Sequence, residues 1–291
     1  MTTLLLPTIE PFDGASLLAF LGARAVAGVE EVIDGTYRRT LALERGGAVV
    51  ALTPGAAGLR VELELGHPDD AGEAAERCRR LFDLDADPRA VAAALGPDAV
   101  IGPLVRARPG LRVPGAVDGF EMAARAIVGQ QVSVAGARTV LGRLAADYGE
   151  PLRAPAGTLT HRFPAPTALA AADPERLPFP RTRAEALVSV ARLAAAGELR
   201  LDPPADPAET HAALLAVRGV GPWTASYVAM RALGDRDAFL PGDVGIRHAL
   251  ARLGSDGGDE RWRPWRSYAL MHLWRSLTRE HAVRASTRFP D

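Results

Sequence analysis

The 291-residue sequence has a single cysteine, Cys78, and contains neither lysine nor asparagine. One cysteine excludes a disulfide framework, a cysteine-rich zinc site and a four-cysteine iron–sulfur cluster within the chain. Because lysine is absent, no side-chain amine is available to form a Schiff base. No apolar run approaches the roughly 20 residues that span a bilayer, and the N-terminus lacks the basic region of a signal peptide. We therefore expect a cytoplasmic protein that does not enter a membrane.

Charge is distributed unevenly along the chain, although the formal net charge is only −1. Residues 1–100 carry 9 arginines and 16 acidic residues, whereas residues 101–291 carry 25 arginines and 19 acidic residues. A basic C-terminal part suggests a polyanionic partner. A solvated charged surface explains the same numbers, so charge alone leaves both interpretations open.

Strand patterns occur only in the first hundred residues. Residues 59–65 alternate apolar and polar side chains, which is typical of a half-buried strand. Two more strand candidates and two helices are expected in the same part of the chain: 36–44, 47–53, 15–27 and 73–82. After about residue 112 the strand signals end, and helical patterns cover 118–130, 133–148, 182–196, 207–216, 222–233, 244–253 and 264–279.

Glycine and proline cluster at 101–114, which indicates a domain boundary. We predict an α+β fold with a small antiparallel sheet domain at 1–110. An all-helical domain follows at 111–235, and a C-terminal helical part at 236–291 completes a cleft.

The most specific local signal is the stretch LLAVRGVGPWTASYV at 214–228. A helix ends near Val217, two glycines form a tight turn, and Pro222 begins a second helix. Backbone N–H groups at such a helix N-terminus can bind an anion. A helix-hairpin-helix of this kind grips DNA phosphates and reads no sequence. An ordinary glycine turn is the alternative, but the complete stretch favours DNA binding.

A carboxylate follows 20 residues after Trp223, in FLPGDVGIRHAL. Asp243 lies where the next helix begins, so it could simply cap that helix. The same position favours the charged form of the carboxylate. A charged carboxylate beside a deoxyribose could stabilise an oxocarbenium-like transition state or orient a water molecule. The local sequence leaves the cap and the catalytic role open.

Three further stretches accompany these two motifs in a fixed order: FEMAARAIVGQQVSV at 120–134, RAEALVSV at 183–190 and RWRPWRSYALMHLW at 261–274. With them, the sequence resembles the helix-hairpin-helix/Gly-Pro-Asp superfamily of DNA glycosylases from about residue 11 to 279. Within that superfamily it most resembles the 3-methyladenine DNA glycosylase II branch.

The resemblance implies a base excision repair enzyme that flips an alkylated base, of the 3-methyladenine or 7-methylguanine type, out of double-stranded DNA. Asp243 would be the catalytic residue of this hydrolase. The resemblance implies a base pocket formed by Phe20, Trp223, Tyr227 and Trp274. It implies DNA contacts from Arg218, Gly219, Val220, Gly221, Thr224, Gln130, Gln131 and Ser133. No cofactor would be required, and we expect a monomer. Backbone carbonyls of Leu215, Val217 and Val220 would hold a monovalent cation, Na⁺ or K⁺.

The sequence departs from the family pattern at three positions. Val244 and Arg275 replace aromatic residues, and Gln131 stands where some members place an apolar wedge. These differences bear on substrate range more than on reaction type. Bifunctional relatives use a lysine just before the tryptophan, whereas this chain has Pro222, so we predict base release without strand cleavage. Two alternatives are a non-catalytic lesion-binding module and a glycosylase for oxidised guanine.

Overall fold

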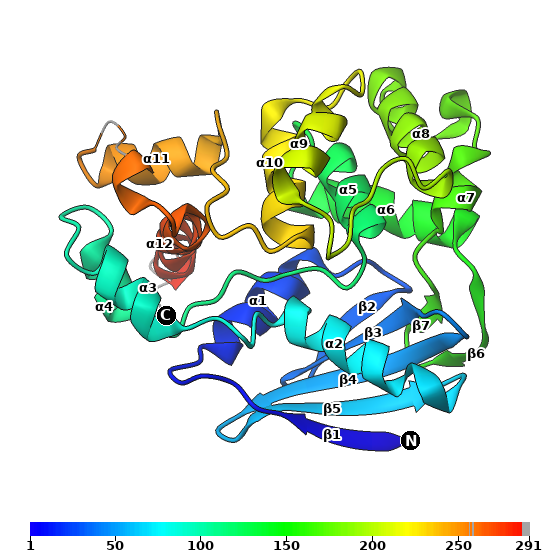
Figure 1. Cartoon of the computed structure of the whole chain (residues 1–291), viewed down its shortest axis with the longest axis horizontal. Coiled ribbons are helices and arrows are strands. Elements are labelled where there is room, and N and C mark those ends of the chain that lie inside the picture. Colours follow the sequence, from blue (N-terminus) through cyan, green and yellow to red (C-terminus); the bar gives the residue numbers. More distant parts are fainter. Residues whose placement is uncertain (256, 258, 287–291) are drawn as a thin grey trace.

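The computed structural model describes residues 1–255, 257 and 259–286, with side chains up to residue 277. Figure 1 shows a β-sheet below, a group of helices above it and a second group to one side. Among the helices of the described chain, none combines the length and hydropathy needed to cross a bilayer. The predicted α+β class is confirmed.

The N-terminal sheet has five antiparallel strands in the order β1-β5-β4-β3-β2. Their bounds are β1 Thr2–Leu6, β2 Glu30–Ile33, β3 Thr36–Ala42, β4 Gly47–Gly55 and β5 Gly58–Leu65. The three predicted strands are confirmed as β3, β4 and β5. The two edge strands were not predicted because five and four residues are too short to show a two-residue period.

Two helices cover one face of this sheet, α1 Gly14–Arg24 and α2 Ala71–Leu81. Their apolar sides meet the inward side chains of the strands, including Tyr37, Val50 and Val61, which are fully buried. The core thus holds α1, including its C-terminal end, at the boundary between the sheet and the helices.

The helical domain is built around α5 Gly119–Val128, where nine of ten residues are buried. Around it pack α6, α8 and α10. The bounds of the other helices in this domain are α6 Val134–Tyr148, α7 Pro166–Ala170, α8 Arg181–Ala195, α9 Pro207–Leu215 and α10 Pro222–Ala232. A hairpin of β6 Pro151–Ala156 and β7 Leu159–His161 interrupts the helices. The expectation that strands end at residue 112 is therefore wrong at this hairpin, whose proline and glycine content masked any alternation.

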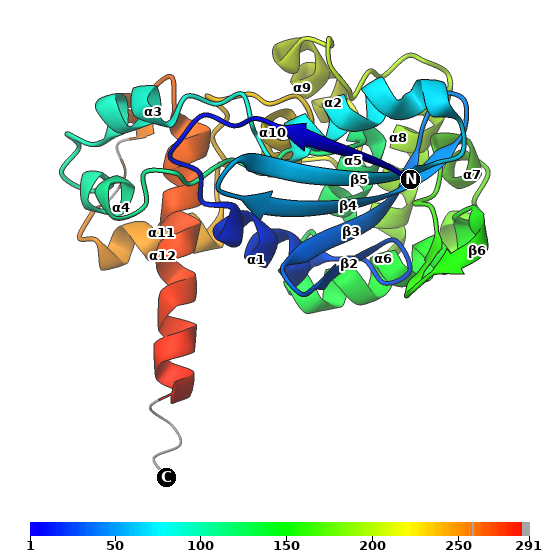
Figure 2. The ribbon, with the colours of Figure 1, turned by 90° about the horizontal axis from the view of Figure 1, so that it is seen from below.

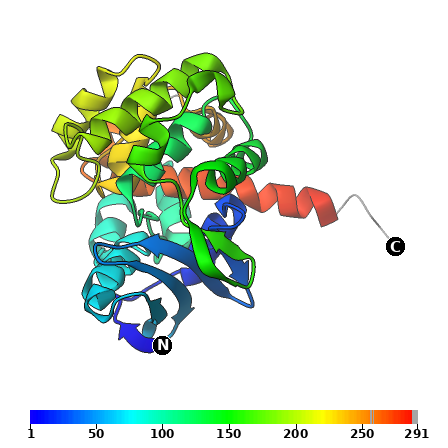
Figure 3. The same ribbon diagram turned by 90° about the vertical axis from the view of Figure 1, so that its right-hand side faces the viewer.

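The C-terminal part contains α11 Val244–Arg252 and α12 Arg266–Ser286. The far end of α12 projects away from the rest of the molecule (Figures 2 and 3). Two helices missed in the sequence, α3 Pro88–Leu95 and α4 Gly102–Ala107, share a hydrophobic core with α11 and α12. Three short 3₁₀ turns complete the secondary structure: Pro68–Asp70, Pro174–Arg176 and Asp259–Trp262. The domain limits expected from the sequence remain a prediction.

Candidate active site

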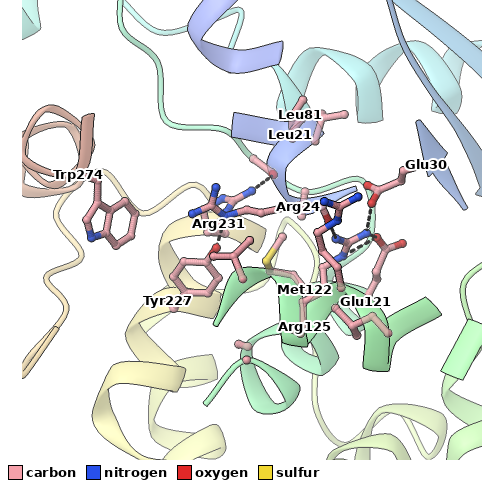
Figure 4. Close-up of a pocket in the computed structure, with 18 of the residues that line it drawn as sticks. Leu21, Arg24, Glu30, Leu81, Glu121, Met122, Arg125, Tyr227, Arg231 and Trp274 are labelled. Atoms are coloured by element: carbon pink, nitrogen blue, oxygen red, sulfur yellow. Dashed lines mark hydrogen bonds and ion pairs between the residues drawn. The ribbon is translucent and has the colours of Figure 1, made fainter. Parts of the chain in front are cut away.

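A cavity of about 550 Å³ lies where the sheet domain, the helical domain and the C-terminal helices meet. Its walls come from α1, β2, β3, α5, α6, α10, the start of α11 and the middle of α12. Figure 4 shows Trp274 and Tyr227 at one end and the Glu30, Glu121 and Arg125 group at the other. Segments far apart in the sequence therefore form one recess.

Asp243 lines this cavity and is half-buried. Its Oδ1 accepts a hydrogen bond from the backbone N–H of Ile246 at 2.8 Å, so the helix-cap interpretation is confirmed. The same oxygen accepts from the Trp274 indole N–H at 3.1 Å, and Oδ2 accepts from the Trp223 indole N–H at 2.9 Å. Three N–H donors thus orient the carboxylate. Asp243 therefore caps α11 and also faces the cavity.

An aromatic wall adjoins the carboxylate. The rings of Trp223 and Tyr227 stack at 5.0 Å with planes 8° apart. The Trp274 ring is tilted by 57° to that of Tyr227 at a centroid distance of 6.4 Å. Trp223 and Tyr227 already cover each other, so a planar ligand would stack on a ring face that is turned to the cavity.

The close approach of Asp243 and Trp274 depends on a glycine that the sequence did not mark. A Cβ atom at Gly245 would lie 3.2 Å from Asp243 Oδ1 and 3.3 Å from Trp274 Cδ1. Any side chain there would press between the two residues. Gly245 therefore permits the Trp274 indole to reach the carboxylate.

Phe20, predicted for the base pocket, is not among the residues that line the cavity. Its ring packs beneath two arginines, with the guanidinium carbons of Arg24 at 3.7 Å and Arg231 at 4.9 Å from the ring centroid. Both arginines line the cavity instead. Arg231 follows Trp223 and Tyr227 at helical spacing, and this periodicity in the sequence could have identified it.

A buried ion cluster forms the deep end of the cavity. Arg39 of β3 and Arg125 of α5 each pair with both Glu30 and Glu121, at distances between 2.6 and 3.1 Å. Burial opposes the charge of Glu30, but Arg125 and Arg39 lower its pKa to about 2. The cluster joins the sheet to α5. No local pattern in the sequence revealed it, because its members are up to 95 residues apart.

The loop between α5 and α6 carries three of the predicted DNA-binding residues. Gln131 is exposed, with a left-handed backbone φ of 57°. Gln130 donates to the Gly219 carbonyl at 3.1 Å and to the Thr224 hydroxyl at 2.9 Å. Ser133 caps α6 and lines the cavity. This loop is therefore tied to the hairpin.

Arg183 of α8 holds the same loop from the other side. Its Nη1 donates to the backbone carbonyls of Val128 and Gln130 at 3.0 and 2.9 Å. Arg183 stands at the head of the RAEALVSV motif, but no signal in the sequence assigned it a contact. Together with Gln130 it fixes the position from which Gln131 projects.

The predicted hairpin is formed by α9, a turn at 216–221 and α10. Gly219 has a φ of 90°, which only glycine adopts readily, and Arg218 is exposed. Gly221 caps α10 without a side-chain hydrogen bond, so the first N–H groups of this helix lack a side-chain acceptor. Thr224 is buried and accepts from Gln130, which makes it a link within the protein.

The three residues predicted to bind a cation through their carbonyls differ in exposure. Leu215 is exposed, whereas the side chains of Val217 and Val220 are buried. The Val217 carbonyl accepts from the Val220 N–H at 3.0 Å, which closes the turn. A carbonyl oxygen has two lone pairs, so this bond leaves one for a cation. The chemistry of the donor set therefore fits Na⁺ or K⁺.

Comparisons with known proteins agree with this arrangement. Residues 3–118 match the family described as AlkA N-terminal domain, and residues 124–267 match the family described as HhH-GPD superfamily base excision DNA repair protein. The chain is 42% identical to the DNA-3-methyladenine glycosylase 2 of Escherichia coli over 272 residues, covering 91% of this chain and 94% of that protein. The superfamily resemblance seen in the sequence is confirmed.

Two other relatives show how far the likeness extends. The chain is 45% identical to the "Probable bifunctional transcriptional activator/DNA repair enzyme AlkA" of Mycobacterium tuberculosis, over 97% of this chain. It spans only 58% of the length of that relative. A solved structure described as 3-methyladenine DNA-glycosylase from Archaeoglobus fulgidus superimposes with a TM-score of 0.79 at 22% identity, over 94% of this chain and 97% of that one. This last likeness concerns the fold.

Proposed function

This chain belongs to the family of DNA-3-methyladenine glycosylase 2, and on that premise we propose that it excises alkylated bases from double-stranded DNA. The base would be flipped out of the duplex into the 550 Å³ cavity, and its N-glycosidic bond hydrolysed there. One observation carries the proposal: Asp243 faces a cavity large enough for a base, and Trp223 links it to the hairpin.

In the proposed reaction Asp243 stabilises the positive charge that develops on the deoxyribose. The bond between C1′ and the base nitrogen breaks, and its electron pair leaves with the base. A water oxygen then bonds to C1′, and the proton that it loses passes to the surrounding water. Because three N–H donors hold the carboxylate, its orientation is set before the charge appears. A cationic alkylated base leaves as a neutral molecule and needs no general acid.

DNA would be held by the hairpin and by the α5–α6 loop. The N-terminus of α10, which has no side-chain cap, offers N–H donors to a phosphate, and Arg218 adds charge beside them. Gln131 would fill the space that the flipped nucleotide leaves. Gln130 ties this residue to the hairpin, so backbone anchoring and gap filling act from one rigid unit.

A monovalent cation would be held by the carbonyls of Leu215, Val217 and Val220. When bound, it would supply positive charge beside the phosphate that the hairpin grips. No other cofactor is proposed, so we expect base release to persist in the presence of EDTA, which removes divalent metals.

We propose base release without strand cleavage. Lysine is absent, and Pro222 occupies the position just before Trp223. A β-lyase step requires an amine that attacks the sugar, and the N-terminal amine is the only one in this chain. A covalent adduct trapped with borohydride would contradict this part of the proposal and leave hydrolysis standing.

The decisive experiment measures base release from DNA that has been methylated with dimethyl sulfate. The wild-type chain should release methylated purines, and the D243N variant should not. Binding of lesion-containing DNA without release would favour the non-catalytic module instead. Release of oxidised guanine in preference to methylated purines would favour the second alternative.

A further inference from the structure

Two arginines in the cavity have no role in the proposed reaction. Arg24 ends α1, Arg231 lies near the end of α10, and both guanidinium groups lie between the aromatic wall and the ion cluster (Figure 4). The deeper cations, Arg39 and Arg125, are matched by two glutamates. Within the described residues, neither Arg24 nor Arg231 forms an ion pair, and their hydrogen-bond acceptors are neutral oxygens.

The middle of the cavity is therefore electropositive. Burial lowers the pKa of both guanidinium groups and Tyr227 opposes this effect, while repulsion from Arg231 lowers the pKa of Arg24 further. Arginine nevertheless stays protonated in proteins. Arg231 is buried and Arg24 is half-buried, and removing such charges from water without a carboxylate partner is costly. Uncompensated charges of this kind are typical of functional sites, where a bound ligand interacts with them.

The two arginines differ in how many of their N–H groups are already engaged in hydrogen bonds. All three nitrogens of Arg231 are engaged, with the carbonyls of Pro114 and Gly115 and with the Tyr227 hydroxyl at 2.6 Å. Arg24 donates from Nη1 to the Phe20 carbonyl at 3.3 Å and also interacts with the Tyr227 hydroxyl, which leaves some of its five N–H groups for a ligand. Because the Tyr227 oxygen accepts from Arg231, its own proton is free to be donated. This part of the cavity wall therefore presents hydrogen-bond donors to a ligand.

We propose that Arg24, assisted by the Tyr227 hydroxyl, binds the acceptor edge of a flipped neutral base and is the residue on which excision of neutral lesions depends. The substrates in question carry a carbonyl oxygen or an unmodified ring nitrogen at that edge, as hypoxanthine does. This inference rests on the proposed function and names the residue that would distinguish neutral from cationic bases.

The chemistry of bond cleavage explains why the two classes of base differ. When the C1′–N bond of a neutral base breaks, the electron pair leaves negative charge on the ring and its carbonyl oxygen. A guanidinium beside that oxygen stabilises the charge as it develops. A cationic alkylated purine becomes neutral on leaving, so it gains nothing from Arg24 and is repelled by it before the bond breaks.

The test compares single-turnover release of hypoxanthine and of 7-methylguanine from otherwise identical duplexes. In R24M, hypoxanthine release should fall about ten- to a thousandfold, the range seen when one stabilising donor is removed. Release of 7-methylguanine should change by less than about threefold or increase. The matched control is R192M, which removes an exposed arginine of α8 that donates to the Ala170 carbonyl away from the cavity. It should alter neither rate.

Two further variants keep the test decisive if R24M does not fold, which thermal melting would reveal. R24K keeps the charge with fewer donors, and Y227F removes only the hydroxyl; each should reduce hypoxanthine release selectively. Equal losses for both bases, or no loss for either, would overturn the role of Arg24. A wild-type chain that releases 7-methylguanine but not hypoxanthine would also overturn it and leave the glycosylase proposal intact. Release of neither base would instead refute the proposed function.

Discussion

Asp243 and Asp118 occupy the same kind of position and have very different surroundings. Each caps the N-terminus of a helix, α11 and α5, and each lines the same cavity. Asp243 receives two indole N–H groups in addition to its cap bond. Asp118, which is also half-buried, instead lies near Asp202 and Glu121, and desolvation followed by repulsion from Asp202 raises its pKa to about 6. Helix capping is therefore common to both carboxylates, whereas the two indole donors distinguish Asp243 from Asp118.

The largest expected effect is the difference in base-release activity between variants of these two aspartates. D243N should lower single-turnover release of 7-methylguanine by about 10²–10⁴-fold, because the amide cannot carry the negative charge. D118N should stay within about threefold of the wild type. Asparagine caps helices as well as aspartate does, so both variants should fold. Comparable losses in the two variants would remove the distinction between these carboxylates.

A smaller loss is expected when the gap between Asp243 and Trp274 is filled. G245V should lower the release rate by up to about 10²-fold, since a displacement near 1 Å of a catalytic group has that order of effect. Its nearest contacts would be Asp243 Oδ1 at 3.2 Å and Trp274 Cδ1 at 3.3 Å. The control is G72A in α2, where a Cβ atom would meet nothing within 4 Å. An unimpaired G245V enzyme would show that the contact with Trp274 is dispensable.

Removal of one indole N–H donor to Asp243 is expected to have a more moderate effect on the release rate. W223F keeps an aromatic ring but loses the N–H bonded to Oδ2 at 2.9 Å. A hydrogen bond to a charged group contributes about 1.5–3 kcal/mol, so release should slow by roughly ten- to a hundredfold. Kinetics of W265F, which alters a tryptophan packed on Tyr268, provide the comparison. Identical rates for W223F and the wild type would mean that the indole does not position the carboxylate.

The smallest effect concerns stability and sharpens the description of Asp118. Its folded-state pKa, about 6, lies above the ordinary 3.8, so the native state is penalised as pH rises and the group ionises. Urea unfolding should show D118N gaining stability relative to the wild type between about pH 4 and 6, and a constant difference above pH 6. The gain should be on the order of 1–3 kcal/mol. A difference that does not vary with pH would contradict the raised pKa.

Local patterns were sufficient where a feature is encoded by neighbouring residues. The period of two at 59–65 predicted β5, and the glycine turn before Pro222 predicted the hairpin. The position of Asp243 at a helix start was also predictable. Features without a local period were missed: the short edge strands, and the β6–β7 hairpin among helices.

The cavity itself could not be predicted in the same way. Phe20 was assigned to its wall by resemblance, yet its ring packs under Arg24 and Arg231, which line the cavity in its place. Gly245 was missed because its importance arises only from the approach of Trp274, a residue of another helix. Contacts between distant segments leave no trace in the spacing of residues.

By itself the sequence determined the class of fold, the hairpin, the candidate carboxylate and the absence of a lysine nucleophile, because each depends on residue type or short-range order. Tertiary structure alone decided which charges remain uncompensated. Arg39 and Arg125 pair with glutamates, whereas in the part of the chain that the structure describes Arg24 and Arg231 contact only neutral oxygens. Electrostatic energy depends on distances in space and on exclusion of water, and neither is written in the order of residues.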